Sequence, residues 1–325
     1  MEFESKNNKI RKEDIMDILA LKKTANEVRK GIVTAVHSAK SGHPGGSLSA
    51  ADLLTYLYFE EMNIDPKDPK KADRDRFVLS KGHIAPGLYS TLAQRGYFPV
   101  EDLKTLRHVG SYLQGHPDMK HIPGVDMSSG SLGQGVSAAV GMALSAKLDN
   151  ASYRVYTLLG DGEIQEGQVW EAAMFAGARK LDNLVVIVDN NGLQIDGKIE
   201  DVCSPYPITD KFKAFNFNVI EIDAHDFEQI ADAFKKARET KGMPTAIVMK
   251  SVKGKGVSFR IQLRVYQFDL HTFLAPVKRQ LFVGVFRSII FCVINAIPQL
   301  HGNRRRIIQH PHAIENGKGN CQCPQ

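Results

Sequence analysis

Two short apolar segments in the middle of the chain restrict its fold more than any other feature. VYTLL (155–159) and LVVIV (184–188) have the length and continuous apolar character of strands that are buried on both faces. The residues between them have the composition of a helix. Two strands that are joined by a helix form a β-α-β unit, in which the strands run parallel. The sequence therefore predicts a parallel sheet.

Further segments extend this alternation of strands and helices. Strands are expected at 76–80, 219–223 and 245–252, and helices at 14–39, after Lys81, over 129–146 and near 226–240. SGHPGGS (41–47) is expected to be a loop, after which Ser47 or Ser49 caps the helix SAADLLTYLYFEEM. The prediction is a doubly wound α/β domain over residues 13–259, with a mainly parallel sheet and helices on both faces.

Polar residues follow both central strands. The first strand ends in Gly160-Asp161-Gly162 and the second in Asp189-Asn190-Asn191. Ligands of an open parallel sheet gather beyond the carboxyl ends of its strands, so an Asp and an Asn side chain are expected to converge there on one hard cation. Mg²⁺ prefers oxygen ligands and keeps phosphates in its shell, and Gly162 would let the backbone approach a diphosphate. Taken singly, either segment would be interpreted as a surface turn.

The spacing of these segments resembles the signature of thiamine diphosphate enzymes, and other segments resemble the transketolase family. They occur in transketolase order: SGHPGGSLSAADLL (41–54), DRFVLSKGH (75–83), GHPD (115–118), SSGSLGQG (128–135) and LGDGEIQEG (159–167). The resemblance spans about residues 14–259. It is greatest to the short N-terminal subunit of split transketolases, which carries only the diphosphate-binding (PP) domain.

The resemblance implies roles for the matching residues. The Mg²⁺ ligands are matched by Asp161, Asn191 and the carbonyl of Leu193. The contacts to thiamine diphosphate are matched by His83, Gly130, Ser131, Leu132, Gly162 and Asn191. The catalytic positions are matched by His43, His116 and Glu166. The two histidines lie on the substrate side, where an imidazole can donate to a developing alkoxide and shuttle protons. Glu166 matches the glutamate that meets the partner's catalytic glutamate.

The implied activity is transfer of a two-carbon ketol unit between sugar phosphates, as in the pentose phosphate pathway, with thiamine diphosphate and Mg²⁺. Nothing in the chain resembles the pyrimidine-binding domain that this chemistry needs, so a separate C-terminal subunit is expected as partner. The assembly would be a homodimer or an α2β2 heterotetramer. Two alternatives stay open: an α-type subunit of a 2-oxo acid dehydrogenase-like enzyme, and an inactive, truncated cofactor-binding module.

The C-terminal segment departs from this family pattern. The resemblance ends at KGKGVSF (253–259), and the expected Trp-His-Gly does not follow. Residues 260–325 hold nine Lys/Arg and two Asp/Glu, so of the chain's net charge of +6 the first 259 residues carry only −1. Nucleic acid is therefore not expected as a partner of the main domain. A frameshift, a gene-prediction error or a fused foreign segment would explain the break, and a genuine extension is the alternative.

The remaining features indicate a cytoplasmic protein. Residues 1–12 are polar, are expected to be flexible and lack the apolar core of a signal peptide. Cys203 alone among the first 259 residues is a cysteine, which fits a reducing compartment. LFVGVFRSIIFCVI (281–294) is short for a membrane span and contains Arg287, so no membrane association is predicted.

Overall fold

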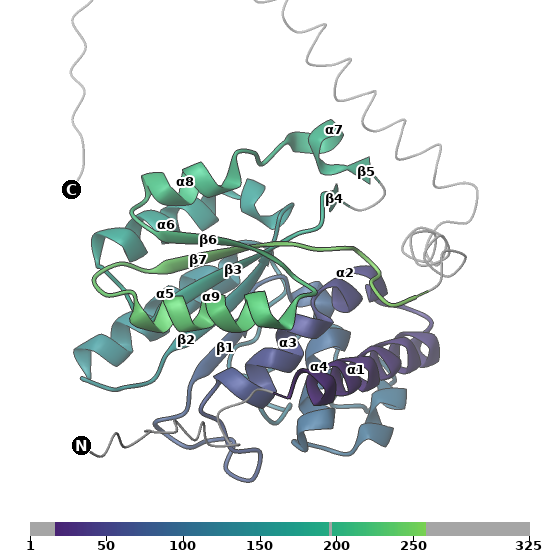
Figure 1. Cartoon of the computed structure of the whole chain (residues 1–325). Helices are drawn as coiled ribbons and strands as arrows, with labels where there is room; N and C mark the ends of the chain where they lie inside the picture. Colours follow the sequence, from purple (N-terminus) through teal and green to yellow (C-terminus); the bar gives the residue numbers. More distant parts are fainter. Residues whose placement is uncertain (1–16, 195–196, 258–325) are drawn as a thin grey trace, which may run out of the picture. The chain divides into compact units, whose positions relative to one another are not determined.

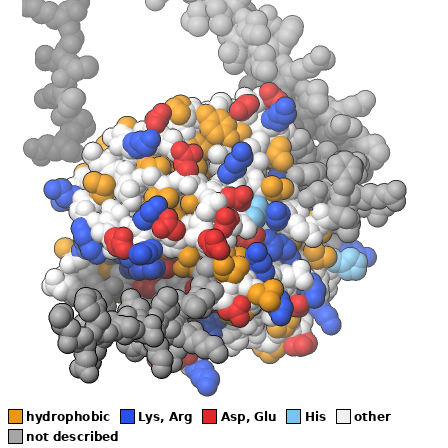
Figure 2. All heavy atoms as spheres, viewed as in Figure 1, with side chains coloured by type: hydrophobic (Ala, Val, Ile, Leu, Met, Phe, Trp, Pro, Cys, Tyr) orange, Lys and Arg blue, Asp and Glu red, His pale blue; other side chains and the backbone are white. Residues whose placement is uncertain are grey.

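The computed structural model describes residues 17–194 and 197–257. The expectations for residues 1–12 and for 260–325, including the apolar segment 281–294, lie outside these described residues. Within the described part, no helix combines the length and apolar character needed to cross a bilayer. The surface in Figure 2 mixes acidic and basic side chains over the face in view, in keeping with the near-neutral charge of this part of the sequence.

A parallel sheet of five strands forms the centre of the fold and confirms the predicted class. Its strands follow the order β1 (Arg76–Leu79), β2 (Val155–Gly160), β3 (Leu184–Asn190), β7 (Thr245–Lys250) and β6 (Asn218–Asp223). Every neighbouring pair in it runs parallel. The carboxyl ends of β1, β2 and β3 therefore lie at one edge of the sheet.

Helices cover both faces of this sheet, as Figure 1 shows. Along β3, Val185 and Ile187 pack into one core cluster, whereas Val186 and Val188 pack into the other. This alternation explains why the strand is apolar throughout. The first cluster is covered by α1 (Ile18–Ala39), α3 (Ala51–Tyr56), α4 (Ala85–Arg95) and α9 (Phe227–Glu239). The second is covered by α5 (Gln134–Leu148), α6 (Gly167–Ala178) and α8 (Ile208–Ala214).

The first long helix begins and ends at identifiable signals. The side chain of Asp17 accepts a hydrogen bond from the Ala20 amide at 2.9 Å and so caps the start of α1. Lys40 adopts a left-handed conformation, with φ of 47°, and ends the helix. The buried residues of α1 recur at helical spacing and face the core: Leu21, Ala25, Val28, Ile32 and Ala35.

The predicted loop at 41–47 is partly helical, which corrects the sequence-based expectation. A short helix α2 (Pro44–Ser49) begins at Pro44, whose fixed φ suits the first position of a helix. Ser47 and Ser49 therefore lie inside α2 and do not cap the following helix. The hydroxyl group of Ser47 donates to the carbonyl of His43 one turn earlier, and the hydroxyl oxygen of Ser49 lies 2.8 Å from the carbonyl of Gly46.

Short elements connect the main ones. A π-helical turn, η2 (Leu57–Glu61), continues α3. Three 3₁₀ turns follow β1, α4 and β2: η3 (Gly82–Ile84), η4 (Val100–Thr105) and η5 (Glu163–Gln165). After β3 the chain forms a small antiparallel pair, β4 (Leu193–Gln194) with β5 (Gly197–Lys198), and the short helix α7 (Ile199–Cys203).

Candidate functional site

A cavity of about 470 Å³ lies at the carboxyl ends of β1, β2 and β3. It gathers residues that are far apart in the chain and that the sequence predicted to act together: His43, His83, Gly130, Leu132, Asp161, Gly162, Asn191 and Leu193. Residues that were not predicted also line it: Gly46, Lys81, Gly160, Glu163 and Gln194. Lys253, for which the sequence left contact with phosphate and a solvated turn equally open, lines it as well. The cavity therefore occupies the place where ligands of parallel sheets bind.

The two central strand ends lie side by side. Gly160 pairs with Asp189 in the sheet register, and the amide of Asp161 donates to the carbonyl of Asp189 at 3.2 Å. The carboxylate of Asp161 accepts the amide of Gly162 at 2.9 Å and, across the strand ends, the amide of Gly192 at 2.6 Å. Asp161 is thus fixed against the segment that carries Asn191.

The charge state of Asp161 fits a cation at this position. The side chain is 2% exposed. Burial, and then the negative charge of Asp189, raise the pKa of Asp161 to about 6. A cation beside the carboxylate would offset both effects. Asp161, the amide of Asn191 and the carbonyl of Leu193 would supply oxygen atoms only, the donor type that Mg²⁺ takes.

A soft or carboxylate-rich metal site is not formed by the described residues. They contain no group of three or more His, Cys, Asp or Glu side chains placed to hold a metal ion. The donor set at the two strand ends, with one carboxylate, leaves coordination positions for phosphate oxygens, as is common for Mg²⁺ in enzymes that bind phosphorylated ligands.

A buried ion pair lies under the cavity. Lys81 lines the cavity and is 2% exposed, and its ammonium group pairs with the carboxylate of Asp189, which is fully buried. The hydroxyl groups of Ser49, at 2.6 Å, and Ser251 also donate to Asp189. Burial opposes the charged form of Asp189, but Lys81 and these hydrogen bonds hold its pKa below the usual range. The pair is tolerated in the interior because both carboxylate oxygens accept hydrogen bonds.

A second buried carboxylate fixes the walls of the cavity. Glu163 accepts hydrogen bonds from the Ser80 hydroxyl at 2.6 Å, the Gly133 amide at 2.9 Å and the Gly160 amide at 3.0 Å. It thereby connects the ends of β1 and β2 with the glycine-rich turn before α5. Gly133 has a φ of 80°, which favours glycine there. Burial raises the pKa of Glu163 despite these bonds.

Sequence reasoning did not assign Lys81, Asp189 or Glu163 to the site, although all three lie in the segments it singled out. Lys81 directly precedes Gly82-His83, Asp189 opens Asp-Asn-Asn, and Glu163 directly follows Gly162. A lysine and a carboxylate that are both placed at the ends of buried strands could have indicated the pair. The contact between Lys81 and Asp189 depends on the pairing of β1 and β3 with β2, on its two sides, and could not be inferred from spacing.

Two predicted histidines meet in the cavity. The rings of His43 and His83 lie 5.0 Å apart, edge to face. Burial, followed by the positive charges of Lys81 and other neighbouring cations, lowers the pKa of His83 to about 3. His83 is therefore a neutral imidazole at physiological pH, with one nitrogen able to donate a hydrogen bond and the other able to accept one.

The other predicted residues lie outside the lining of the cavity. His116 lies next to Gly130, where an added Cβ would be 3.3 Å from the His116 ring, and its carbonyl accepts the Tyr89 hydroxyl at 2.7 Å. Burial and then the charge of Arg107 lower the pKa of His116. Ser131 and Glu166 are exposed. Glu166 immediately precedes α6, and because it is exposed, a second molecule can contact its side chain.

A family profile described as "Transketolase, thiamine diphosphate binding domain" matches residues 20–265. The chain belongs to the transketolase family. It is 48% identical over 239 residues to the 6-deoxy-6-sulfo-D-fructose transketolase subunit SqwG of a Clostridium species, covering 74% of this chain and 87% of that protein. It is 43% identical to one of the apulose-4-phosphate transketolase subunits of Phocaeicola vulgatus, covering 75% of this chain and 86% of that protein.

Single-chain transketolases match over a smaller part of their length. Mouse transketolase is 44% identical over 76% of this chain, but the match covers 39% of the mouse protein. The transketolase structures from Leishmania mexicana and Campylobacter jejuni are both 36% identical, with TM-scores of 0.70 and 0.71, and 37% and 39% of those chains are covered. The chain corresponds to the N-terminal, thiamine diphosphate-binding part of a transketolase, as the sequence predicted.

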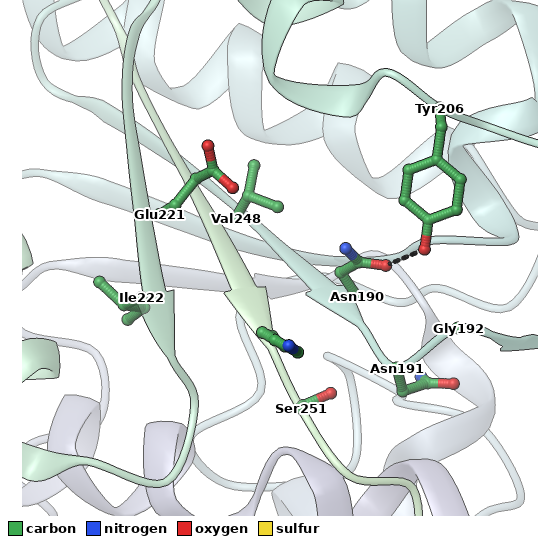
Figure 3. A pocket seen from close by; sticks show the side chains of 9 residues that line it. Asn190, Asn191, Gly192, Tyr206, Glu221, Ile222, Val248 and Ser251 are labelled. Carbon is green, nitrogen blue, oxygen red and sulfur yellow. Dashed lines mark hydrogen bonds between the residues drawn. The ribbon is translucent and has the colours of Figure 1, made fainter.

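A smaller hollow of about 260 Å³ lies beside the main cavity described above, at the ends of β3, β6 and β7. Figure 3 shows that the two neighbouring asparagines differ: Asn190 points to Tyr206, whose hydroxyl donates to it at 2.8 Å, whereas Asn191 points away from that bond. Asn191 lines both hollows. Its amide oxygen accepts the Leu193 amide at 3.1 Å. Of the two, Asn191 is the one placed to serve the main cavity.

Proposed function

We propose that this transketolase-family subunit binds thiamine diphosphate through Mg²⁺ and transfers a two-carbon ketol unit between sugar phosphates. The observation that supports this most is the convergence of the Asp161 and Asn191 strand ends with His43 and His83 around one cavity. One oxygen-donor site and two imidazoles in one space suit a ligand whose diphosphate is held at one end, and whose other end one imidazole orients while the other holds or moves a proton.

Each residue has a distinct task in this proposal. Asp161, Asn191 and the Leu193 carbonyl would hold Mg²⁺, and the positively charged Lys253 would face the diphosphate from the cavity wall. Gly162 leaves room for the diphosphate beside the backbone. His43 and His116 would hold or move a proton at the substrate carbonyl and hydroxyl groups, and neutral His83 would orient the bound ligand. When bound, thiamine diphosphate supplies the carbon nucleophile and electron sink.

A second subunit with the pyrimidine-binding domain completes the site in this proposal. Support comes from the relatives named as transketolase subunits, 86–87% of whose length this chain covers. The chain covers 39% of mouse transketolase, so most of that protein has no counterpart here. Glu166 is exposed and would contact the partner. A homodimer or α2β2 heterotetramer and a cytoplasmic location stay predictions.

Two other functions are less well supported. An α-type subunit of a 2-oxo acid dehydrogenase-like enzyme would not be expected to share 40–48% identity with transketolase subunits. An inactive cofactor-binding module is favoured by one specific observation, namely that no Trp-His-Gly follows residue 259 in the sequence. Such a module would bind the cofactor but would not turn over substrate.

The test of the proposed function is a two-chain assay. The full-length chain is mixed with a candidate partner, encoded next to its gene, that carries the pyrimidine-binding domain, and is supplied with thiamine diphosphate, Mg²⁺ and an aldose phosphate acceptor. We expect turnover with a ketose phosphate donor, none with a 2-oxo acid, and none from either chain alone. Full turnover by the chain alone would refute the need for a partner. Cofactor binding without turnover by the mixture would support the inactive module instead.

A further inference from the structure

The segment after β7, residues 251–257, contributes Lys253 to the lining of the cavity. Lys253 lines the cavity, and its aliphatic stem lies over α2, where an added Cβ on Gly45 would be 3.1 Å from it. The amide of Gly254 donates to the carbonyl of Gly45 at 3.0 Å. The position of Lys253 therefore depends on how firmly this segment is held.

His225 holds the segment one residue before Lys253. The amide of Val252 donates to Nε2 of His225 at 3.0 Å, and Nδ1 of His225 lies 2.8 Å from the carboxylate of Asp52. A ring nitrogen that accepts an N–H carries no proton, so the proton is on Nδ1 and is donated to Asp52. The side chains of His225 and Asp52 are only 8% and 7% exposed.

Arg29 extends this arrangement to the end of the segment. Its guanidinium pairs with Asp52 at 2.5 Å, and its Nε donates to the carbonyl of Lys255 at 3.2 Å. Gly256, with a φ of 92°, lets the backbone pass close to Arg29, because an added Cβ would lie 2.8 Å from that side chain. Burial disfavours the charged form of Asp52, but its bonds to His225 and Arg29 lower its pKa. The Asp52 carboxylate thus bonds to both His225 and Arg29, and each of these side chains also bonds to the backbone of residues 251–257.

We propose that His225 is a positioning residue for cofactor binding, which acts by holding Val252 and thereby placing the Lys253 ammonium at the cavity. This inference rests on the proposed function, in which the cavity takes the diphosphate of thiamine diphosphate. A lysine side chain is long and flexible, so fixing its backbone reduces the entropy that is lost when the ammonium group meets an anion. His225 contacts neither the substrate nor the cofactor in this proposal.

A pair of polar variants separates the two bonds of His225. In His225→Asn the amide nitrogen reaches Asp52 from the position of Nδ1, but the side chain is too short to reach the Val252 amide. In His225→Gln the side-chain oxygen reaches the position of Nε2 and can accept that amide. We expect thiamine diphosphate with Mg²⁺, titrated calorimetrically into the full chain, to bind about 10-fold more weakly to His225→Asn, and His225→Gln to restore most of the affinity.

The coupling to Lys253 distinguishes positioning from a general structural role. In a double-mutant cycle with Lys253→Met, adding His225→Asn should lower the affinity by no more than about 2-fold, because the group that it positions is gone. His121→Asn is the matched control, because it removes the imidazole of another His–Asp pair, one whose imidazole is 68% exposed. This variant should bind thiamine diphosphate like the wild type.

The outcomes are distinguishable. Wild-type protein that does not bind thiamine diphosphate, either alone or mixed with the candidate partner subunit, would refute the proposed function itself. Wild-type binding with equal affinities for His225→Asn and His225→Gln would overturn the positioning role. The positioning role would also be overturned if the losses of affinity caused by His225→Asn and Lys253→Met multiplied in the double variant. This holds whether or not His225→Asn lowers the melting temperature.

Discussion

At the scale of single residues, His83 shows how the cavity controls charge. Its motif, Ser-Lys-Gly-His, is visible in the sequence, but its neutral state is not. Burial and the positive charge of Lys81, with smaller effects from His43, Lys253 and His116, lower the pKa of the ring. Three of these neighbours come from distant parts of the chain, so only the fold brings their charges together. The state of His83 therefore could not have been predicted from its motif.

The depressed pKa of His83 makes stability depend on pH in a defined window. The folded-state value of about 3 lies below the usual 6.5, so as pH falls the unfolded chain takes up the proton first. The stability contributed by neutral His83 is complete above pH 6.5 and is lost progressively towards pH 3. Urea unfolding at pH 7, 5.5 and 4 should show that the free energy of unfolding of His83→Asn falls by about 3 kcal/mol less than that of the wild type over this range. Equal losses in the two proteins would contradict the assignment.

At the scale of elements, the strands could be predicted and the short helix at the site could not. β2, β3 and β7 were predicted because continuous apolar runs are typical of central parallel strands, and the edge strand β6 was predicted as an extension of the strand-helix alternation. α2 was not, because Pro-Gly-Gly is typical of a loop. Tertiary contacts allow this helix: an added Cβ on Gly46 would lie 2.9 Å from Ile84, and Ser49 donates to Asp189. Glycine here serves close packing, which local propensity does not reveal.

Two helical glycines give opposite predictions at this scale. An added Cβ on Gly177 in α6 would lie 1.9 Å from the carbonyl oxygen of Phe215, so Gly177→Ala forces α6 away from the end of α8. We expect it to lower the free energy of unfolding by about 2 to 3 kcal/mol. Gly141 in α5 has open space around its Cβ position, and Gly141→Ala should raise that free energy by about 0.5 to 1 kcal/mol. Urea denaturation of the two variants measures both; a smaller cost for Gly177→Ala than for Gly141→Ala would contradict the packing described.

At the scale of the whole molecule, most of the site residues that the family motifs predicted line one cavity. Three of them lie outside its lining. Asp161 and Asn191 were expected together because parallel strands end at the same edge, and the family resemblance added the carbonyl of Leu193. His116, Ser131 and Glu166 lie outside its lining, on parts of the surface that a single chain leaves open. In the proposed function His116 acts at the substrate, Ser131 contacts the cofactor and Glu166 meets the second subunit, and the fold of one chain does not define those contacts.

The central claim is that two strand ends hold Mg²⁺ against a bound diphosphate. It is tested by measuring thiamine diphosphate affinity with Mg²⁺ and with a chelator, in the wild type, in Asp161→Ala and in the control Asp182→Ala, whose carboxylate accepts the Gly242 amide away from the cavity. The account predicts that Mg²⁺ strengthens binding by roughly 10- to 100-fold in the wild type and in the control, and has no effect in Asp161→Ala. An undiminished Mg²⁺ effect in Asp161→Ala would contradict it.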